Sequence, residues 1–518
     1  MSSFPQPFIS STSHWQATNR GPSSLYNHNK DVSPPSHADI LIVGGGMMGS
    51  ALSYFLTRKG AEGDGKKVVL VEAKDIGSGA SGRNGGHLGP ATAHGYYNLL
   101  QPPPVGTKLS SKEAVRVIQA ERDNMELITK IIHDEGITDK VDLWRGHLCE
   151  VHQKAEARPM KEMYDAWLAA RKRYGYADDT DTTWIDDPAE AKRVSRFKNV
   201  ASVQLRPAGS VHSHKLCTEL ARLALKSPHS DYDIYSWCPV STITPSKKGG
   251  WTVKTAKGTI QAKRVVLCVN AYTKDFFPED ELLHSHILPQ FTQLSLITPP
   301  ETFSGEKALQ YTYNMTDEGY LIQTPMGGIV VGGGLDPLVR AGKIDPGVGN
   351  SLDDSITHQV WDEYLARYCP DHFEGWGPEG KGQGETRSWS GILTRVKDIL
   401  PVVGPVPDRE GLFLAAGFHG HGMSRIFSVG QALAATLQTG KWDESLLPRS
   451  FELTTERLER ARDYPCERPD EFVNMMMKEE KSSTNWMAEK EIRYAEKVSQ
   501  RKEAEKKQKE KDSWCVIA

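Results

Sequence analysis

Short runs of apolar residues alternate along the chain with glycine-rich and charged stretches. The runs at 40–43, 68–71 and 265–269 are unbroken, as is typical of strands buried on both faces of a parallel sheet. The first run leads into a glycine turn and an apolar stretch, which predicts a strand, a tight turn and a helix packed on that strand. Residues 109–197 are charged, with Ala, Glu, Arg and Leu at mixed spacing. That composition predicts a helical outer layer.

The glycines after the first run have the spacing of a dinucleotide-binding turn. Gly44, Gly46 and Gly49 permit a tight turn, close approach of the backbone to a pyrophosphate, and packing of helix on strand. Met48 lies in the same turn and belongs to the predicted site. The N-terminus of the helix suits the phosphates without a basic side chain, because its N–H groups are unpaired.

A carboxylate follows the second apolar run. Glu72 lies about twenty residues beyond the glycine turn, where a ribose-binding acid is expected. We predict that Glu72 accepts hydrogen bonds from a ribose diol and disfavours the additional phosphate of NADP. The alternative interpretation is an ordinary glycine turn with a surface glutamate.

The loop after Glu72 is rich in small residues, which is unusual for NAD enzymes and favours a flavin. Its glycines allow the backbone to lie against a flat ligand, and we include Gly85 in the site. Ser81, Arg83 and Asn84 are candidate donors to a phosphate or to the flavin edge. The alternative is a mobile surface loop.

These motifs resemble the D-amino-acid oxidase superfamily of FAD-dependent amine oxidoreductases. Ser81 to Gly86 and Asn270-Ala271-Tyr272 most resemble the gamma-glutamylputrescine oxidase branch, although most members carry glycine in place of Asn270. Residues 238–243 resemble the strand that contacts the adenine, so the resemblance adds Val240 to the site. It implies FAD as the cofactor.

The resemblance also implies the fold: an α/β protein whose Rossmann-like FAD-binding domain is interleaved with an antiparallel-sheet substrate domain. We expect the FAD-binding domain in residues 38–100, 200–275 and 391–440, a helical layer in 101–199, and the substrate domain in 285–390. Residues 1–37 are rich in Pro, Ser, Asn and His, so we expect a disordered leader. Residues 441–518 form a C-terminal extension with a charged helical tail.

Residues 389–404 match the family pattern without a gap, with one informative departure. Amino-acid oxidases of this group commonly carry an arginine where this chain has Leu393, and an arginine there pairs with a substrate carboxylate. Leucine cannot form that pair. Arg395 shares the same face of a strand, so a displaced carboxylate contact remains a hypothesis.

A second glycine-rich turn precedes a helix expected from about Ser424 to Leu437. In the family this helix faces the flavin pyrimidine, where its N-terminus stabilises the negative charge of the reduced flavin. The candidates here are Gly417, Gly420, His421, Gly422 and Met423. The alternative is a helix-capping loop with incidental histidines.

The resemblance implies oxidation of the C–N bond of a small amine or amino-acid-like substrate to an imine, with hydride transfer to the flavin. His87, His419 and His421 are weak candidates for a base. Oxygen is the expected electron acceptor. The alternatives are a dehydrogenase with another acceptor, and a catalytically silent flavoprotein that recruits partners at a membrane.

Composition excludes several classes of protein. The formal net charge is −3, from 63 basic and 66 acidic residues, which argues against a nucleic-acid partner. The seven cysteines are dispersed, which favours a reducing, intracellular and cytoplasmic setting; we predict no metal site.

The last four residues, Cys515-Val516-Ile517-Ala518, match a prenylation signal. Prenylation of Cys515 predicts peripheral membrane contact, and the alternative is a charged solubilising tail.

Overall fold

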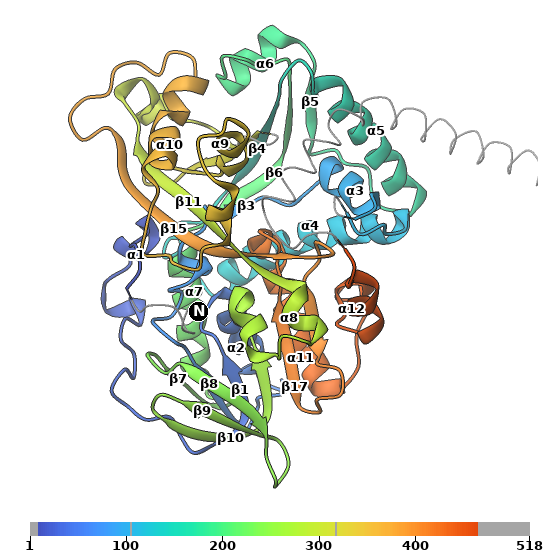
Figure 1. Cartoon of the computed structure of the whole chain (residues 1–518). Helices are drawn as coiled ribbons and strands as arrows, with labels where there is room; N and C mark the ends of the chain where they lie inside the picture. Colours follow the sequence, from blue (N-terminus) through green and yellow to red (C-terminus); the bar gives the residue numbers. More distant parts are fainter. Residues whose placement is uncertain (1–8, 104–105, 316–318, 465–518) are drawn as a thin grey trace, which may run out of the picture. The chain divides into compact units, whose positions relative to one another are not determined.

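Two β-sheets form the framework of the computed structural model, which describes residues 9–103, 106–315 and 319–464 (Figure 1). The first sheet, sheet A, has a central parallel part in the order β7-β2-β1-β10-β17. Its strands are β1 (His37–Val43), β2 (Lys67–Val71), β7 (Asp231–Tyr235), β10 (Gly258–Leu267) and β17 (Leu412–Ala416). The antiparallel strands β8 (Val240–Pro245), β9 (Trp251–Thr255) and β16 (Val402–Pro405) complete it. This confirms the predicted Rossmann-like sheet.

Both faces of sheet A are covered, which explains the unbroken apolar runs. In β1, Ile40 and Ile42 point into one hydrophobic cluster, and Leu41 and Val43 point into another. The first cluster includes α2 (Met47–Leu56), α7 (Ser213–Leu225) and α11 (Ile426–Thr439). The second includes β8, β9, α8 (Leu282–His286) and α12 (Thr455–Ala461). Period-two alternation is absent from the sequence because both sides of each strand are buried.

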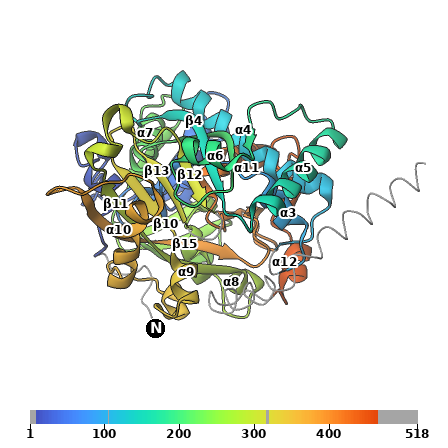
Figure 2. The same cartoon turned by 90° about the horizontal axis from the view of Figure 1, so that it is seen from above.

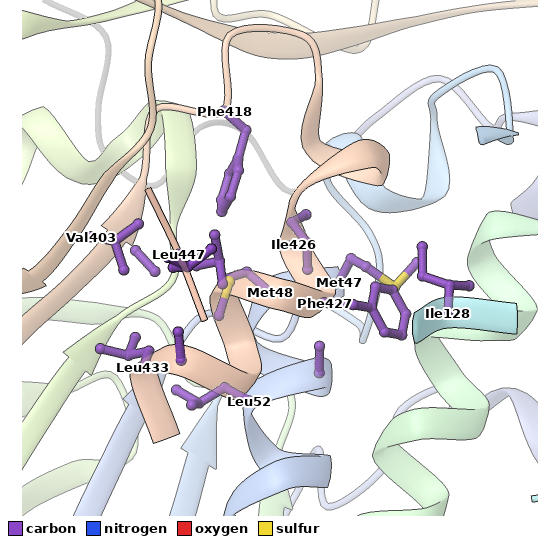
Figure 3. Close-up of a cluster of buried hydrophobic side chains, with 14 of the residues drawn as sticks. Met47, Met48, Leu52, Ile128, Val403, Phe418, Ile426, Phe427, Leu433 and Leu447 are labelled. Carbon is purple, nitrogen blue, oxygen red and sulfur yellow. The ribbon is translucent and has the colours of Figure 1, made fainter. Parts of the chain in front are cut away.

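The helix α4 (Ser111–Asp134) packs on α11 and belongs to the first hydrophobic cluster of sheet A. Figure 3 shows Ile128 of α4 next to Met47 of α2 and Phe427 of α11. Ile128 and Phe427 are fully buried. The helices α3 (Ala93–Leu100) and α5 (Ala157–Arg173) contact α4 and each other.

The second sheet, sheet B, has the order β15-β11-β14-β13-β12-β4-β6-β3, with β5 beside β6. Its strands are β3 (His87–Leu88), β4 (Trp144–His152), β5 (Thr183–Ile185), β6 (Ser202–Ser210), β11 (Ile287–Thr298), β12 (Thr312–Met315), β13 (Gly319–Gln323), β14 (Ile329–Gly332) and β15 (Gly384–Val396). One face packs on an aromatic-rich cluster that includes α6 (Pro188–Ser195), α9 (Leu335–Arg340) and α10 (Gln359–His372). Figures 1 and 2 show α10 beside β11.

The structure corrects three expectations about domain boundaries. The predicted helical layer 101–199 also contains β4 and β5. Strand β6, expected in the FAD-binding segment 200–275, and residues 391–396 of β15, expected in the FAD-binding segment 391–440, belong to sheet B. Sheet B is mostly antiparallel, but β4 and β12 pair in parallel. Strand β4 was missed because its charged residues face neighbouring side chains rather than solvent: Glu150 is buried and forms an ion pair with Arg206 of β6.

The expectation of a disordered leader is wrong for residues 9–36. They contain α1 (His14–Ala17), which lies beside α7 (Figure 1). Trp15, at 2% exposure, packs against side chains of sheet B and against the ring of His212 at the start of α7. This polar segment does not form a hydrophobic core by itself. It is ordered because its polar groups form hydrogen bonds with the rest of the fold.

No helix among the described residues is long and apolar enough to cross a membrane. The charged tail and Cys515 lie outside the described residues.

Candidate cofactor site

A cavity lies at the carboxyl ends of β1, β2 and β10 and continues onto sheet B. Its wall includes most of the predicted cofactor residues: Gly44, Gly46, Met48, Glu72, Ser81, Arg83, Asn84, Val240, Gly420, Gly422 and Met423. Ligands of parallel α/β sheets bind at this edge, where loops follow the strands. The glycine turn at residue 44 and the late turn at residue 420 therefore contribute to one cavity, although they are far apart in the sequence.

The first glycine turn leaves no room for side chains. Gly44 has a φ of +106°, and a Cβ there lies 2.7 Å from the carbonyl oxygen of Cys268. At Gly46 a Cβ lies 3.0 Å from Ser81 Oγ. Gly49 is not in the wall; a Cβ there lies 2.0 Å from the carbonyl oxygen of Gly44, so its role is packing of α2 on the turn. The N-cap residue of α2, Gly46, makes no side-chain cap. The N–H of Met47 binds Ser81, and the helix end still suits an anion because of its positive dipole.

Glu72 lies at the end of β2, as predicted, and its carboxylate is already oriented. The N–H of Gly45 donates to Oε2 at 2.6 Å, and the N–H of Lys74 donates to Oε1 at 2.9 Å. Burial raises the pKa of the Glu72 carboxyl, and these two hydrogen bonds oppose that shift. A carboxylate oriented in this way has lone pairs left for hydroxyl donors.

The side chains of the loop at 78–86 bind protein groups rather than pointing free into the cavity. Ser81 Oγ accepts from the N–H of Met47 at 2.7 Å. The Arg83 guanidinium donates to the carbonyls of Ser78 and Ser390, at 2.9 Å and 2.7 Å. It is therefore used to fix the loop, and these contacts do not favour its interpretation as a phosphate donor.

The side chain of Asn84 and the backbone of Gly85 also contact protein groups. Asn84 Nδ2 donates to the carbonyl of Ser81 at 3.2 Å, and Asn84 Oδ1 accepts from the N–H of Gly86 at 2.7 Å. Gly85 does not contribute to the wall. A Cβ there lies 2.4 Å from the ring of Tyr320, so glycine permits close contact between the loop and sheet B.

The late turn is connected to β10 through Asn270. The N–H of Gly417 donates to Asn270 Oδ1 at 3.1 Å. Asn270 has a φ of +44°, and asparagine tolerates this left-handed region after glycine, which accounts for the departure from the glycine of most relatives. Gly417 itself lies outside the wall, against Val396.

The helix after the late turn begins two residues later than predicted. A 3-10 turn, Gly422–Ser424, precedes α11. Asn124 of α4 is fully buried, and its Oδ1 accepts from the N–H groups of Phe427 and Ser428 at 2.9 Å and 3.0 Å. These two helix N–H groups are therefore already paired within the protein.

None of the three histidine candidates lies in the cavity wall. His87 Nε2 is 2.8 Å from Thr312 Oγ1, and burial lowers the pKa of His87 to about 3. His419 Nδ1 accepts from the N–H of Val396 at 3.1 Å, and burial places its pKa well below the ordinary value. The His421 side chain is 46% exposed and lies 3.9 Å from Glu121.

Several wall residues were missed by the sequence reasoning. Thr292, Leu294 and Tyr320 lie on one face of sheet B, together with Leu393, which the sequence had singled out, and Asp354 lies in the loop before α10. No motif marks Thr292, Leu294, Tyr320 or Asp354, because they meet the glycine turns only through sheet packing. Arg395 is outside the wall, and its Nε donates to Gln290 Oε1 at 2.6 Å. Cys238 and Cys268 also line the cavity, and burial raises the pKa of both thiols, so both are unreactive.

The wall fits the dinucleotide predicted from the sequence. It combines a turn that any Cβ would fill, the N-terminus of α2 next to that turn, and a carboxylate at the end of the second strand. It then extends onto sheet B, which leaves space beyond a nucleotide for a flat ring system.

Known proteins share both the sequence pattern and the fold. A family model described as FAD dependent oxidoreductase matches residues 39–436. A probable oxidoreductase, OrdL, of Rhizobium meliloti is 25% identical over 253 residues, 49% of this chain and 53% of that protein. The gamma-glutamylputrescine oxidoreductase of Escherichia coli is 23% identical over 405 residues, 77% of this chain and 83% of that protein.

The solved structure of glycine oxidase from Geobacillus kaustophilus superposes with a TM-score of 0.61 at 21% identity, and covers 81% of this chain and 99% of that one. The chain spans about half of the OrdL protein and most of the other two. Because the family match covers well over half of the sequence, the chain belongs to the family of FAD-dependent oxidoreductases, with FAD as its cofactor.

Proposed function

We propose that this protein oxidises the C–N bond of a small amine to an imine. The observation that carries the proposal is the wall contributed by the strands of sheet B. Within the described part of the chain, that wall consists of uncharged residues: Thr292, Leu294, Tyr320, Gly391, Ile392, Leu393 and Thr394. The bound FAD supplies the acceptor for a hydride from the carbon next to nitrogen. Next to these uncharged strands an ammonium ion is disfavoured, which favours the neutral amine that this reaction requires.

The chain's own residues have separate roles in the proposal. Gly44 and Gly46 would admit the pyrophosphate next to the N-terminus of α2, Glu72 would accept from the ribose, and Val240 would contact the adenine. The turn of Gly420, Gly422 and Met423 would hold the flavin at its pyrimidine. Support comes from their shared cavity and from the contacts of Glu72.

We further propose that the substrate has no carboxylate next to the reacting carbon. Leu393 occupies the position of the arginine of amino-acid oxidases, and Arg395 is held by Gln290 outside the wall. A diamine or a gamma-glutamylated amine satisfies this requirement. The similarity to the gamma-glutamylputrescine oxidoreductase of Escherichia coli supports the same class.

Anaerobic reduction of the bound flavin tests this proposal. We expect diamines and gamma-glutamylated amines to bleach the yellow flavin about tenfold or more faster than glycine or sarcosine at equal concentration, a difference of about 1.4 kcal/mol. The variant Leu393→Arg is the matched control, and it is expected to shift the preference towards amino acids by supplying a carboxylate partner.

Faster reduction by glycine than by every amine would contradict the substrate class. A flavin that remains oxidised with every candidate favours the silent recruiting flavoprotein. Oxygen is the proposed acceptor, and release of hydrogen peroxide during aerobic turnover distinguishes it from a dehydrogenase with another acceptor.

The pH dependence of turnover tests whether His87 is the base. With its pKa lowered to about 3, the ring is protonated only in strong acid and stays neutral throughout the range from pH 5 to 9, so its titration cannot produce a limb near neutrality. We therefore expect the rising limb of kcat/KM to report the substrate amine, and His87→Asn to leave its midpoint unchanged. A limb that moves or disappears in His87→Asn would assign the base to this histidine.

We also propose that the protein is cytoplasmic and that Cys515 is prenylated. The lipid would bring the protein into peripheral contact with a membrane. The Cys-Val-Ile-Ala ending supports the modification, and the described cysteines are free thiols, as in reducing compartments. The intact mass of the chain expressed in a eukaryotic host tests this, since an unmodified C-terminus would refute it. One lipid chain alone gives only marginal membrane affinity.

A further inference from the structure

Residues 9–19, the N-terminal segment, lie between the loop at 78–86 and sheet B. They precede the range of the family match, which begins at residue 39. Three side chains of the segment donate to backbone carbonyls of that loop, which forms part of the cofactor cavity wall. Further hydrogen bonds join the segment to the Arg83 side chain, sheet B, the loop before α10 and the start of α7. We infer the role of the N-terminal segment from its contacts with the loop and with sheet B.

Trp15 makes the central apolar contact. It is 2% exposed and packs in a cluster with Leu294, Ile322, Val330 and Trp389 of sheet B. Trp15 Nε1 donates to the carbonyl of Asn84 at 2.5 Å, and Trp389 Nε1 donates to the carbonyl of Arg83 at 2.8 Å. Two indoles, one from the N-terminal segment and one from β15, therefore fix consecutive carbonyls of the loop.

Ser11 joins the segment to Arg83. The Arg83 guanidinium donates to the carbonyl of Ser11 and to Ser11 Oγ. The N–H of Ser11 donates to the carbonyl of Asp354 at 2.8 Å, and Asp354 Oδ2 lies 3.5 Å from Arg83 Nε. Arg83 and Asp354 both line the cofactor cavity, so Ser11 connects two wall residues that come from opposite halves of the chain.

The short helix α1 adds two more contacts to the loop. Ser13 and Gln16 form a reciprocal capping box, and each also binds the loop. Ser13 Oγ donates to the carbonyl of Gly82, and Gln16 Nε2 donates to the carbonyl of Ser78 at 3.1 Å. A four-residue helix is not stable alone, so α1 forms because it is docked on the loop.

We propose that the N-terminal segment determines how tightly FAD is retained, by fixing the loop at 78–86 in the conformation that closes the cofactor cavity. Trp15 and Ser11 are positioning residues that act on the cofactor through the loop carbonyls and through Arg83. Loss of either contact frees a loop rich in glycine, whose ordering must then be provided by cofactor binding itself.

The rate of FAD release from the oxidised protein tests this inference without turnover. We expect Trp15→Ala to release FAD about tenfold or more faster than the unmodified chain, measured as the rise of flavin fluorescence after dilution. Trp15→Phe keeps the ring but loses the indole N–H, and is expected to fall between the two. Ser11→Ala, which removes the hydroxyl contacts and retains the backbone ones, is expected to accelerate release more weakly, and it keeps the inference testable if Trp15→Ala does not fold.

Asn29→Gly is the matched control. Asn29 Nδ2 donates to Asp233 Oδ1 at 3.0 Å and to the carbonyl of Ile234 at 2.9 Å, on the strand β7. Neither partner lines the cofactor cavity, and glycine tolerates the positive φ of Asn29. A purely structural role for residues 9–36 predicts that Asn29→Gly and Trp15→Ala lower the thermal midpoint without a selective change in FAD release.

Release rates within twofold of the unmodified chain in folded Trp15→Ala and Ser11→Ala would overturn the inference. Equal acceleration in Asn29→Gly would overturn it as well. Failure of the amine proposal is distinguishable, because it concerns flavin reduction and leaves FAD retention unaffected.

Discussion

Gly49→Ala is expected to destabilise the protein and to prevent FAD binding. Alanine in place of a helical glycine ordinarily stabilises by about 0.5–1 kcal/mol. Here the added Cβ lies 2.0 Å from the carbonyl oxygen of Gly44, so α2 must move away from the glycine turn. Overpacking of this kind costs about 1–3 kcal/mol, and it displaces the helix N-terminus from the pyrophosphate. Thermal unfolding and the flavin content of the purified protein measure the two effects.

Gly430→Ala is the matched control, because Gly430 lies in α11, which packs on α2. A Cβ there lies 3.3 Å from Phe55 and 3.5 Å from Ala51, a contact that a small side-chain shift relieves. We expect its thermal midpoint and flavin content to remain near those of the unmodified chain. Normal flavin content in Gly49→Ala would show that the close packing of α2 on the turn is not required for FAD binding.

Arg425→Met is expected to lower the free energy of unfolding by about 3–5 kcal/mol. Arg425 Nε donates to Glu121 Oε1 at 2.8 Å, and the two side chains are 6% and 0% exposed. Removal of the guanidinium leaves the Glu121 carboxylate buried without its partner. Because Arg425 is the residue before α11, we also expect the turn at Gly420–Met423 to loosen and FAD to bind more weakly. Chemical denaturation and FAD titration measure both.

The double variant Arg425→Met/Glu121→Gln separates charge from packing. Glutamine still accepts the N–H of Ala91, which donates to Glu121 Oε2 at 2.7 Å, and it carries no charge. We expect the double variant to recover most of the lost stability. Arg193→Met, which removes an exposed ion pair with Glu190, is expected to leave stability unchanged. Equal losses in the single and double variants would show that Arg425 stabilises through packing alone.

The nucleotide-binding half was predictable because its signals are local. The apolar run at 40–43, the glycines that follow it, and Glu72 after the next run are each explained by contacts between neighbouring strands and their own turns. The start of α11 was misplaced because Asn124, a residue of another helix, accepts its first N–H groups. A sequence pattern contains no signal for a cap that comes from three hundred residues away.

The sequence by itself determined that a buried strand leads through a tight glycine turn into a helix, because glycine positions and apolar runs report backbone geometry directly. It also indicated that a carboxylate-binding arginine is missing at Leu393. Only the tertiary structure decided that Arg83 binds protein groups, that Tyr320 and Asp354 belong to the cavity wall, and that residues 9–19 are ordered. Those features depend on pairs of polar and aromatic groups distant in the chain, and such groups have no periodic pattern until the two sheets bring them together.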